Sequence, residues 1–306
     1  MPDRTTTSLL TRIAVSEPGA GPYAVTTGPD GALWITLVDA GEIVRLVPGD
    51  PPGGPHRLDR HGLSAPGCGP TVITTGADGA LWFTRYRDHS IGRITVDGTA
   101  SSVSLPTPDS GPYGMVSGPD GALWFTQLNA DRIGRIGTDG TVTEIPLPVS
   151  GAFPSAITTG PDDALWCTLH HADALGRVDT DGGITVHPLP ATGAGPVGIT
   201  RGPDGALWFT EITAGRIGRM DTDGAVREFS LPDRGCRPHA IIADPDRGVC
   251  WYTAWATGRV GSITPDGHIE EYELPDPDAG PHGLTVGTDG AVYVTMATGA
   301  LARLEP

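Results

Sequence analysis

The sequence has 306 residues and a net charge of −16, and all 20 of its basic residues are arginines. This acidic balance disfavours nucleic acid and anionic membranes as partners, and the absence of lysine excludes Schiff-base chemistry and lysine general bases. No stretch has the length and apolarity of a signal segment or a membrane span, so we expect a cytoplasmic protein.

The first predicted element is a strand within residues 8–15, and seven similar repeats follow it. Each repeat opens on a proline, most often after glycine, and 42 to 48 residues separate one proline from the next. These prolines are Pro22, Pro70, Pro112, Pro154, Pro196, Pro238 and Pro281. A nearly constant period that fills the whole chain is typical of a repeat architecture.

The third repeat shows the elements of one unit. A strand after Pro112 is followed by the turn Pro119-Asp120-Gly121, where proline presets the turn and glycine tolerates a positive φ. The second strand, residues 122–126, is apolar at nearly every position, which suits a strand covered on both faces. Residues 131–136 and 142–148 predict a third and a fourth strand. Four strands per repeat of this length predict a propeller blade.

The ends of the chain predict how the ring closes. The last repeat stops at Pro306 after its third strand, whereas residues 8–15 belong to no repeat. We therefore predict an all-β, seven-bladed β-propeller of four antiparallel strands per blade, in which the N-terminal strand completes the last blade. Residues 1–306 form one domain in this prediction, and residues 47–64 extend the first blade at its surface. The tryptophans Trp34, Trp82, Trp124, Trp166 and Trp208 recur with the repeat, so we expect them in the blade cores.

The residue after each repeat proline should line the central channel at one height. This inner ring is Tyr23, Thr71, Tyr113, Ser155, Val197, His239 and His282. Blade folding does not require histidine there, and histidine exchanges protons near neutral pH. Two histidines from adjacent blades therefore predict an acid/base pair, with polar residues that merely hold channel water as the alternative.

A second ring should come from the end of each second strand. It contains the charged residues Arg85 and Glu211 and the aromatic residues Tyr86 and Trp255, and its mixture of side chains favours a ligand pocket. Either charged residue could instead form a surface ion pair. His170 and His171 would point to opposite sides if their strand continued, which argues against joint metal binding. The four cysteines have no metal-ligand spacing, which favours a reduced protein.

The repeat, together with Arg237-Pro238-His239 and Gly280-Pro281-His282, resembles the virginiamycin B lyases over essentially the whole chain. The resemblance implies a seven-bladed propeller that opens a cyclic depsipeptide antibiotic by elimination across its ester C–O bond. It also implies that His282 removes the proton α to the carbonyl, that His239 assists, and that Mg²⁺ polarises the substrate.

The sequence departs from that family at the implied metal ligands. Two glutamates of the family correspond to Gly280 and Ala297 here, and a divalent cation of this kind generally needs at least one carboxylate. We therefore expect no metal cofactor and no metal site.

Three functions stay open on the sequence. The first is a lyase-like enzyme that eliminates, cyclises or isomerises a cyclic peptide or another natural product without metal. The second is a true Mg²⁺-dependent streptogramin B lyase, which would recruit another acid such as Glu211. The third is a non-enzymatic propeller that binds a ligand or a protein. For the enzyme we predict His282 as base and His239 as its partner, with Tyr23, Tyr113, Arg85, Tyr86, Trp255 and Glu211 around the substrate. Arg237 is expected to brace its loop, and the protein is expected to be a monomer.

Overall fold

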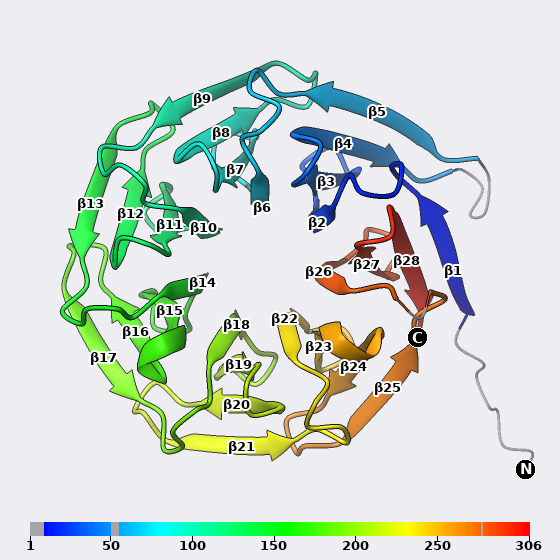
Figure 1. The fold of residues 1–306 in the computed structure, drawn as a ribbon. Helices are drawn as coiled ribbons and strands as arrows, with labels where there is room; N and C mark the ends of the chain where they lie inside the picture. The colour runs from blue at the N-terminus through cyan, green and yellow to red at the C-terminus, as the bar shows by residue number, and fades with distance from the viewer. Residues whose placement is uncertain (1–8, 50–54, 277) are drawn as a thin grey trace, which may run out of the picture.

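The computed structural model describes residues 9–49, 55–276 and 278–306. These residues form seven four-stranded sheets, and Figure 1 shows that the sheets are arranged in a ring around a central axis. All neighbouring strands within a sheet are antiparallel, and in six of the sheets they follow one another in chain order. The predicted seven-bladed β-propeller is therefore confirmed. Of the extended segment predicted at residues 47–64, positions 50–54 lie outside the described residues, and part of the remainder forms the outer strand of the first blade.

The innermost strands all begin at a repeat proline: β2 (Pro22–Thr27), β6 (Pro70–Thr75), β10 (Pro112–Ser117), β14 (Pro154–Thr159), β18 (Pro196–Arg201), β22 (Pro238–Asp244) and β26 (Pro281–Val286). The second strands are β3 (Leu33–Leu37), β7 (Leu81–Arg85), β11 (Leu123–Gln127), β15 (Leu165–Leu169), β19 (Leu207–Glu211), β23 (Val249–Ala254) and β27 (Val292–Met296). The third strands are β4 (Glu42–Val47), β8 (Ser90–Ile94), β12 (Arg132–Ile136), β16 (Ala174–Val178), β20 (Arg216–Met220), β24 (Arg259–Ile263) and β28 (Ala300–Glu305). The outermost strands are β5 (Arg57–Gly62), β9 (Ala100–Ser104), β13 (Val142–Pro146), β17 (Ile184–Pro188), β21 (Val226–Ser230), β25 (Ile269–Glu273) and β1 (Leu9–Ala14). Blades are numbered 1 to 7 from β2 to β26.

The N-terminal strand closes the ring, as predicted. Strand β1 pairs antiparallel with β28 from Leu9 opposite Glu305 to Ala14 opposite Ala300, and it forms the outer edge of blade 7. Figure 1 shows this strand, in dark blue, beside the red C-terminal strand. Chain segments from the two ends thus share one sheet, which leaves the ring without an open seam.

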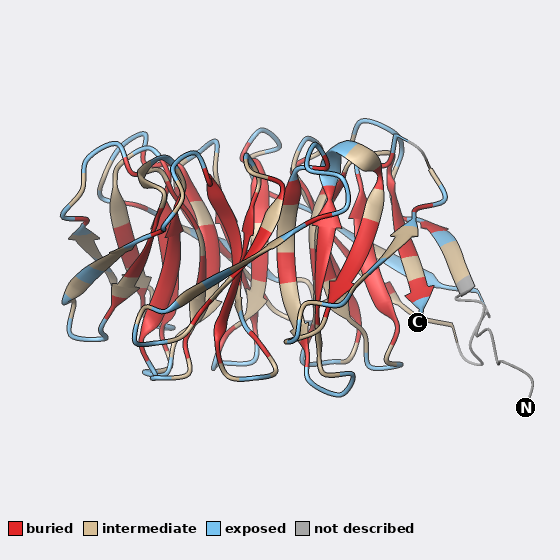
Figure 2. Cartoon of the chain, turned by 90° about the horizontal axis from the view of Figure 1, so that it is seen from below, coloured by how far each residue is buried: buried red, intermediate tan, exposed pale blue. Residues whose placement is uncertain are grey.

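The core lies between neighbouring blades, because the second strand of each blade is covered on both faces. Trp124 of blade 3, for example, packs in one cluster with Leu165 and Cys167 of blade 4. Figure 2 shows this buried band across the middle of the molecule, with exposed loops at both ends. The five recurrent tryptophans are at most 2% exposed, which confirms their predicted place in the core.

A repeated polar contact ties each tryptophan to its hairpin turn. In blade 3, Trp124 Nε1 donates to Asp120 Oδ1 at 3.0 Å, and Arg135 Nε donates to Asp120 Oδ2 at 2.7 Å. The same three residue types make the same contacts in blades 1, 2, 4 and 5. Burial of an indole N–H costs free energy unless the N–H is hydrogen-bonded. The turn aspartate accepts this hydrogen bond, and the same contact fixes the hairpin turn to the core.

Two further findings concern the cysteines and membrane-spanning helices. The cysteines Cys68, Cys167, Cys236 and Cys250 are all buried and free. Of the residues that the structure describes, none belongs to a helix long and apolar enough to cross a membrane.

Candidate functional site

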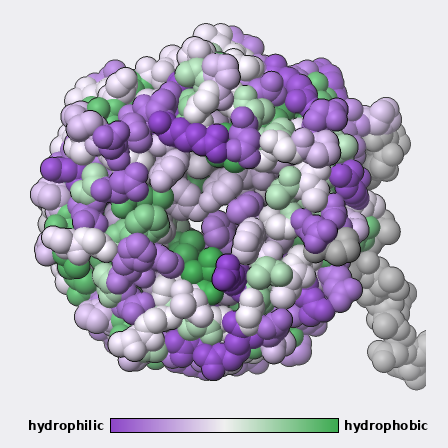
Figure 3. Space-filling view, in the orientation of Figure 1, coloured by the Kyte–Doolittle hydropathy of each residue, from purple (hydrophilic) through white to green (hydrophobic). Residues whose placement is uncertain are grey.

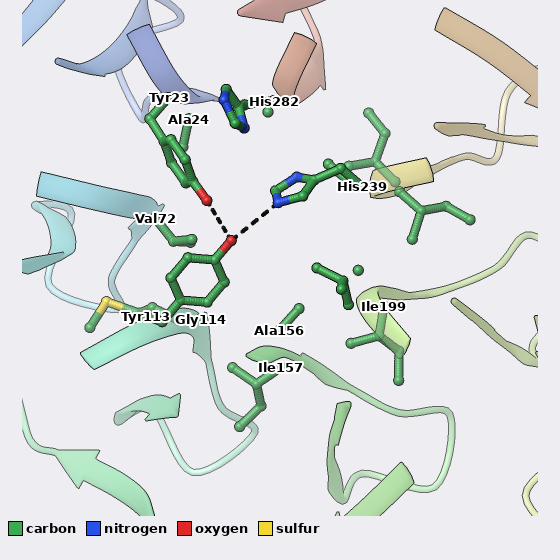
Figure 4. Close-up of a pocket in the computed structure, with 17 residues that line it drawn as sticks. Tyr23, Ala24, Val72, Tyr113, Gly114, Ala156, Ile157, Ile199, His239 and His282 are labelled. Carbon is green, nitrogen blue, oxygen red and sulfur yellow. Dashed lines mark hydrogen bonds between the residues drawn. The ribbon is translucent and has the colours of Figure 1, made fainter. Parts of the chain in front are cut away.

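Four side chains of the inner ring meet at the mouth of the central channel: Tyr23, Tyr113, His239 and His282 (Figure 4). His282 stacks on Tyr23 with ring centroids 4.6 Å apart. The centroids of His239 and His282 are 5.3 Å apart, and the two planes are nearly perpendicular at 85°. The two imidazoles therefore border one cavity that a single ligand can contact from both sides.

The phenols connect to one of the imidazoles. The Tyr23 and Tyr113 hydroxyl oxygens are 2.5 Å apart, and the Tyr113 hydroxyl lies 3.4 Å from His239 Nε2. Burial raises the pKa of both tyrosines, so both hydroxyls keep their protons at neutral pH. The tyrosines can therefore donate hydrogen bonds within the cluster, and one O–H can point to a ligand.

Burial also determines the protonation state of the two histidines. It lowers the pKa of His282 to about 4, and burial together with the nearby His282 lowers the pKa of His239 to about 3. Both rings are consequently neutral at pH 7. The Nδ1 atom of each ring is buried and has no hydrogen-bond partner among the residues that the structure describes. Two neutral imidazoles with unused nitrogen atoms are suited to accept a proton from a ligand or to donate a hydrogen bond to it.

A bulge in each innermost strand turns the ring residue toward the axis. The register shifts between Pro238 and Ile241 in β22 and between Pro281 and Leu284 in β26, so two residues there oppose one residue of the next strand. The opposing residue is Thr253 in blade 6 and Thr295 in blade 7. Bulges of this kind re-aim side chains and are frequent beside active sites.

The opposing threonine also joins adjacent blades. Thr253 Oγ1 accepts the Ala240 N–H at 3.0 Å and donates to the carbonyl of His282 at 2.9 Å, while Thr210 donates to the carbonyl of His239 at 2.8 Å. All seven blades repeat this bridge to the next ring residue. The constant position of a threonine in the second strand of every blade is the sequence signal from which this bridge could have been predicted.

The cavity has two parts. Below the ring, the channel is lined by small and apolar residues: Ala24, Val72, Gly114, Ala156, Gly198, Ala240 and Gly283. Beside Tyr113 and His239, an upper pocket is formed by Leu128, Phe153, Val197 and Ile212 together with Ser155 and His170. Figure 3 shows this upper pocket as a hydrophobic area at the rim of the central hollow, over β14 and β18. An apolar pocket with a few converging polar groups is the usual form of a small-molecule site.

The structure does not place Arg85 and Glu211 in this cavity, contrary to our prediction. Arg85 is 4% exposed and forms an ion pair with Asp88. Glu211 is fully buried in blade 5, where its Oε2 accepts a hydrogen bond from Arg216 Nε at 2.7 Å. Burial raises the pKa of Glu211 to about 7, against the opposing effect of Arg216. Arg85 and Glu211 are the last residues of their strands, and side-chain directions alternate along a strand up to its last residue. This alternation points both side chains into the protein and away from the channel.

The aromatic members of the second ring lie nearer to the site. Trp255 is 39% exposed, and its ring centroid is 6.5 Å from that of His282. Tyr86 lies against Gly111, in the loop that leads to Tyr113: a Cβ atom on Gly111 would be 2.9 Å from its ring. The residue that follows the strand end, rather than the last residue of the strand, therefore borders the channel mouth.

His170 and His171 do not diverge, because the strand ends at Leu169 and a short 3₁₀ turn, His170–Ala172, follows it. Their ring centroids are 5.0 Å apart, and Phe153 stacks on His171 at 4.6 Å. His170 lines the upper pocket together with His239. Our expectation of opposite directions was conditional on a continued strand, and that condition fails.

The family-implied Mg²⁺ does not fit the residues around His282. A Cβ atom on Gly280 would lie 3.4 Å from the Ala297 Cβ and 3.5 Å from Trp255 Nε1, so these positions are adjacent and face an indole. They offer a methyl group and an N–H donor where Mg²⁺ needs oxygen ligands. Across the described parts of the chain, no three His, Cys, Asp or Glu residues are grouped as metal ligands would be.

Comparison with known proteins agrees with this fold. The model of the virginiamycin B lyase family matches residues 8–304. A virginiamycin B lyase of Saccharopolyspora erythraea is 55% identical over 93 residues, which are 30% of this chain and 29% of that relative. One of Streptomyces coelicolor is 53% identical over 44 residues, 14% of this chain and 15% of the relative. These aligned stretches span less than a third of the curated relatives.

The similarity to solved structures extends over the whole ring. The virginiamycin B lyase of Staphylococcus aureus is 38% identical, with a TM-score of 0.91 and coverage of 98% of this chain and 99% of that one. A catalytically inactive histidine-to-alanine variant from Staphylococcus aureus, solved with quinupristin, is 37% identical with the same TM-score and the same coverage. The family model matches nearly every residue, and the solved virginiamycin B lyase superposes on the whole ring. These two findings decide which family the chain belongs to. The chain belongs to the virginiamycin B lyase family.

Proposed function

We propose that the protein is a carbon–oxygen lyase that acts on a cyclic peptide or a related natural product by abstracting a proton α to a carbonyl, without a divalent metal. His282 is the base, and His239 is its partner. The observation that carries this proposal is the pair of neutral imidazoles 5.3 Å apart at one cavity. The complex of a related inactive variant with quinupristin supports a ligand of this size and class.

The lowered pKa of His282 supports its role as base. A ring with a pKa of about 4 is unprotonated at pH 7, so no proton must leave before it acts. Such a ring is also a weak base, and the reaction therefore needs hydrogen-bond donors for the negative charge that develops on the substrate oxygen. Stacking on Tyr23 holds the imidazole in one orientation.

His239 is better suited to donate a hydrogen bond than a proton. With a pKa of about 3 it carries no spare proton at neutral pH, but a neutral imidazole still has one N–H. The Tyr113 hydroxyl at 3.4 Å from Nε2 can take part in fixing which nitrogen holds that hydrogen. His239 and the tyrosine pair together supply hydrogen-bond donors at the cavity that His282 borders.

Quinupristin turnover by the wild-type protein, followed by mass spectrometry, tests the proposal. Elimination opens the ring without changing the mass and creates an alkene, whereas hydrolysis adds the mass of one water. His282→Ala should reduce turnover on the order of 10²–10⁴-fold. A chelator should leave turnover unchanged, and so should Glu211→Gln, because that carboxylate is buried in blade 5.

The alternatives give different results. Loss of turnover with chelator, restored by Mg²⁺, would identify a metal-dependent streptogramin B lyase. Tight binding without turnover by the wild-type protein would identify a ligand-binding propeller. Equal rates for wild type and His282→Ala would contradict the assignment of the base.

A further inference from the structure

Arg237 places a positive charge at the rim of the site. Its guanidinium lies over the Trp255 ring, with Cζ 5.8 Å from the centroid, and Trp255 in turn borders His282. The side chain is exposed, and among the described residues it has no carboxylate within ion-pair distance. Many other arginines of this acidic chain are paired, as Arg216 and Arg259 are. The guanidinium of Arg237 therefore contacts Trp255, the aromatic residue that borders the site.

The backbone indicates that this side chain is retained at a cost. Arg237 has a φ of 52°, in the left-handed region that favours glycine. The equivalent residue before the repeat proline is glycine in five of the other six blades: Gly21, Gly69, Gly111, Gly195 and Gly280, all with positive φ. The remaining blade has Phe153, whose ring lines the upper pocket. The two blades that keep a side chain at this strained position thus direct it to the ligand side of the propeller.

The proposed reaction creates an anion that such a side chain recognises. His282 takes the Cα proton, the C–H electron pair becomes the C=C bond, and the neighbouring Cβ–O bond breaks. The pair from that bond stays on the ester oxygen, so the leaving group is a carboxylate. Atoms and electrons balance without water or a redox partner. A planar guanidinium matches a carboxylate with two parallel N–H donors.

We propose that Arg237 binds the carboxylate leaving group and so supplies the fixed cation that a metal would supply elsewhere. This inference rests on the proposed elimination. Trp255 holds the guanidinium at the rim by a cation–π contact while its indole lies beside Gly280, where the family's carboxylate would stand. A cation built from the chain needs no carboxylate ligands, which Gly280 and Ala297 do not provide.

The first test is Arg237→Gly, which removes the charge and also relieves the positive φ. The variant should fold at least as stably as the wild type, while kcat for quinupristin falls on the order of tenfold to a hundredfold and millimolar guanidinium restores part of it. Arg201→Gln is the control, because Arg201 is an exposed arginine at the end of β18 that is farther from the inner ring. An unchanged kcat in Arg237→Gly, or equal losses in both variants, would overturn the proposal.

The second test measures binding without turnover. The probe is the linear acid made by alkaline opening of quinupristin, compared with its methyl ester. The wild-type protein and Arg201→Gln should bind the acid on the order of tenfold more tightly than the ester, and Arg237→Gly should not distinguish them. If the wild type fails to turn over quinupristin but shows this preference, the elimination fails and the carboxylate site stands. Turnover with no preference for the acid would overturn the carboxylate site alone.

Discussion

At the scale of single residues, burial makes the histidine pair ready for chemistry at neutral pH. His239 and His282 sit at a channel mouth among Tyr23 and Tyr113, and their Nδ1 atoms have no partner among the described residues. In water an imidazole is half protonated near pH 6.5, so an exposed pair would be partly cationic in the physiological range. Here the low dielectric environment penalises the charged form, and both rings stay neutral.

This predicts an unusually acidic pH profile. We expect kcat/KM to rise as the pH increases through about 4, the pKa of His282, and to be level from pH 6 to pH 8. The free energy of unfolding should also decrease as the pH decreases. Between pH 6.5 and about 3 the histidines of the unfolded chain bind more protons than those of the folded chain, and these protons favour the unfolded state. Steady-state kinetics and denaturant titrations across pH 3.5–8 measure both.

Glu211 provides the control for that profile. Its pKa is raised to about 7, so a catalytic Glu211 would place a midpoint near neutrality. The Glu211→Gln variant should keep the wild-type profile, because blade 3 already accommodates glutamine, Gln127, at the same position. A midpoint near 7 that disappears in Glu211→Gln would return this carboxylate to the site.

At the scale of the strands, one buried threonine per blade sets the position of the ring residue in the next blade. Thr253→Val removes the donor to the His282 carbonyl and the acceptor for the Ala240 N–H, with almost no change in shape. We expect a loss of about 2 kcal/mol in the free energy of unfolding and a several-fold lower kcat, because His282 is held less firmly. Thermal or chemical unfolding and single-turnover kinetics measure the two effects.

Thr168→Val is the matched comparison. Thr168 makes the same bridge from Ala156 to the carbonyl of Val197, and neither of those residues belongs to the histidine and tyrosine cluster. It should lose similar stability and keep its kcat. Equal effects on kcat in both variants would show that the threonines stabilise the ring without positioning the base.

At the scale of the whole molecule, closure by β1 holds blade 7 and therefore His282 in place. Ile13 of β1 is 7% exposed and packs in a cluster that includes Val25 and Leu33 of blade 1. Ile13→Ala should lower the free energy of unfolding by about 2–5 kcal/mol, since it leaves a cavity at the seam. Arg12→Ala, an exposed change on the same strand, should have an effect within about 0.5 kcal/mol. Denaturant unfolding of both variants measures the difference, and equal midpoints would mean that the seam contributes little to stability.

The sequence by itself determined the propeller, its seven blades, its closing strand and the membership of the inner ring. A constant period places equivalent positions at equal heights around an axis, so Tyr23, Tyr113, His239 and His282 could be brought together from spacing alone. The recurrent turns and tryptophans are local signals of the same kind. Each depends on a few neighbouring residues and on the backbone angles that proline and glycine prefer.

Only the tertiary structure decided which side chains of the second ring reach the ligand. Arg85 and Glu211 turn into the protein, whereas Trp255 borders His282, because the direction of a side chain at a strand end depends on where the strand stops. The lowered pKa of His239 and of His282 likewise arises from contacts between blades, because side chains of several blades bury the two rings. The burial of the inner-ring histidines is a property of the assembled ring, because no single repeat contains all the neighbours that cover them.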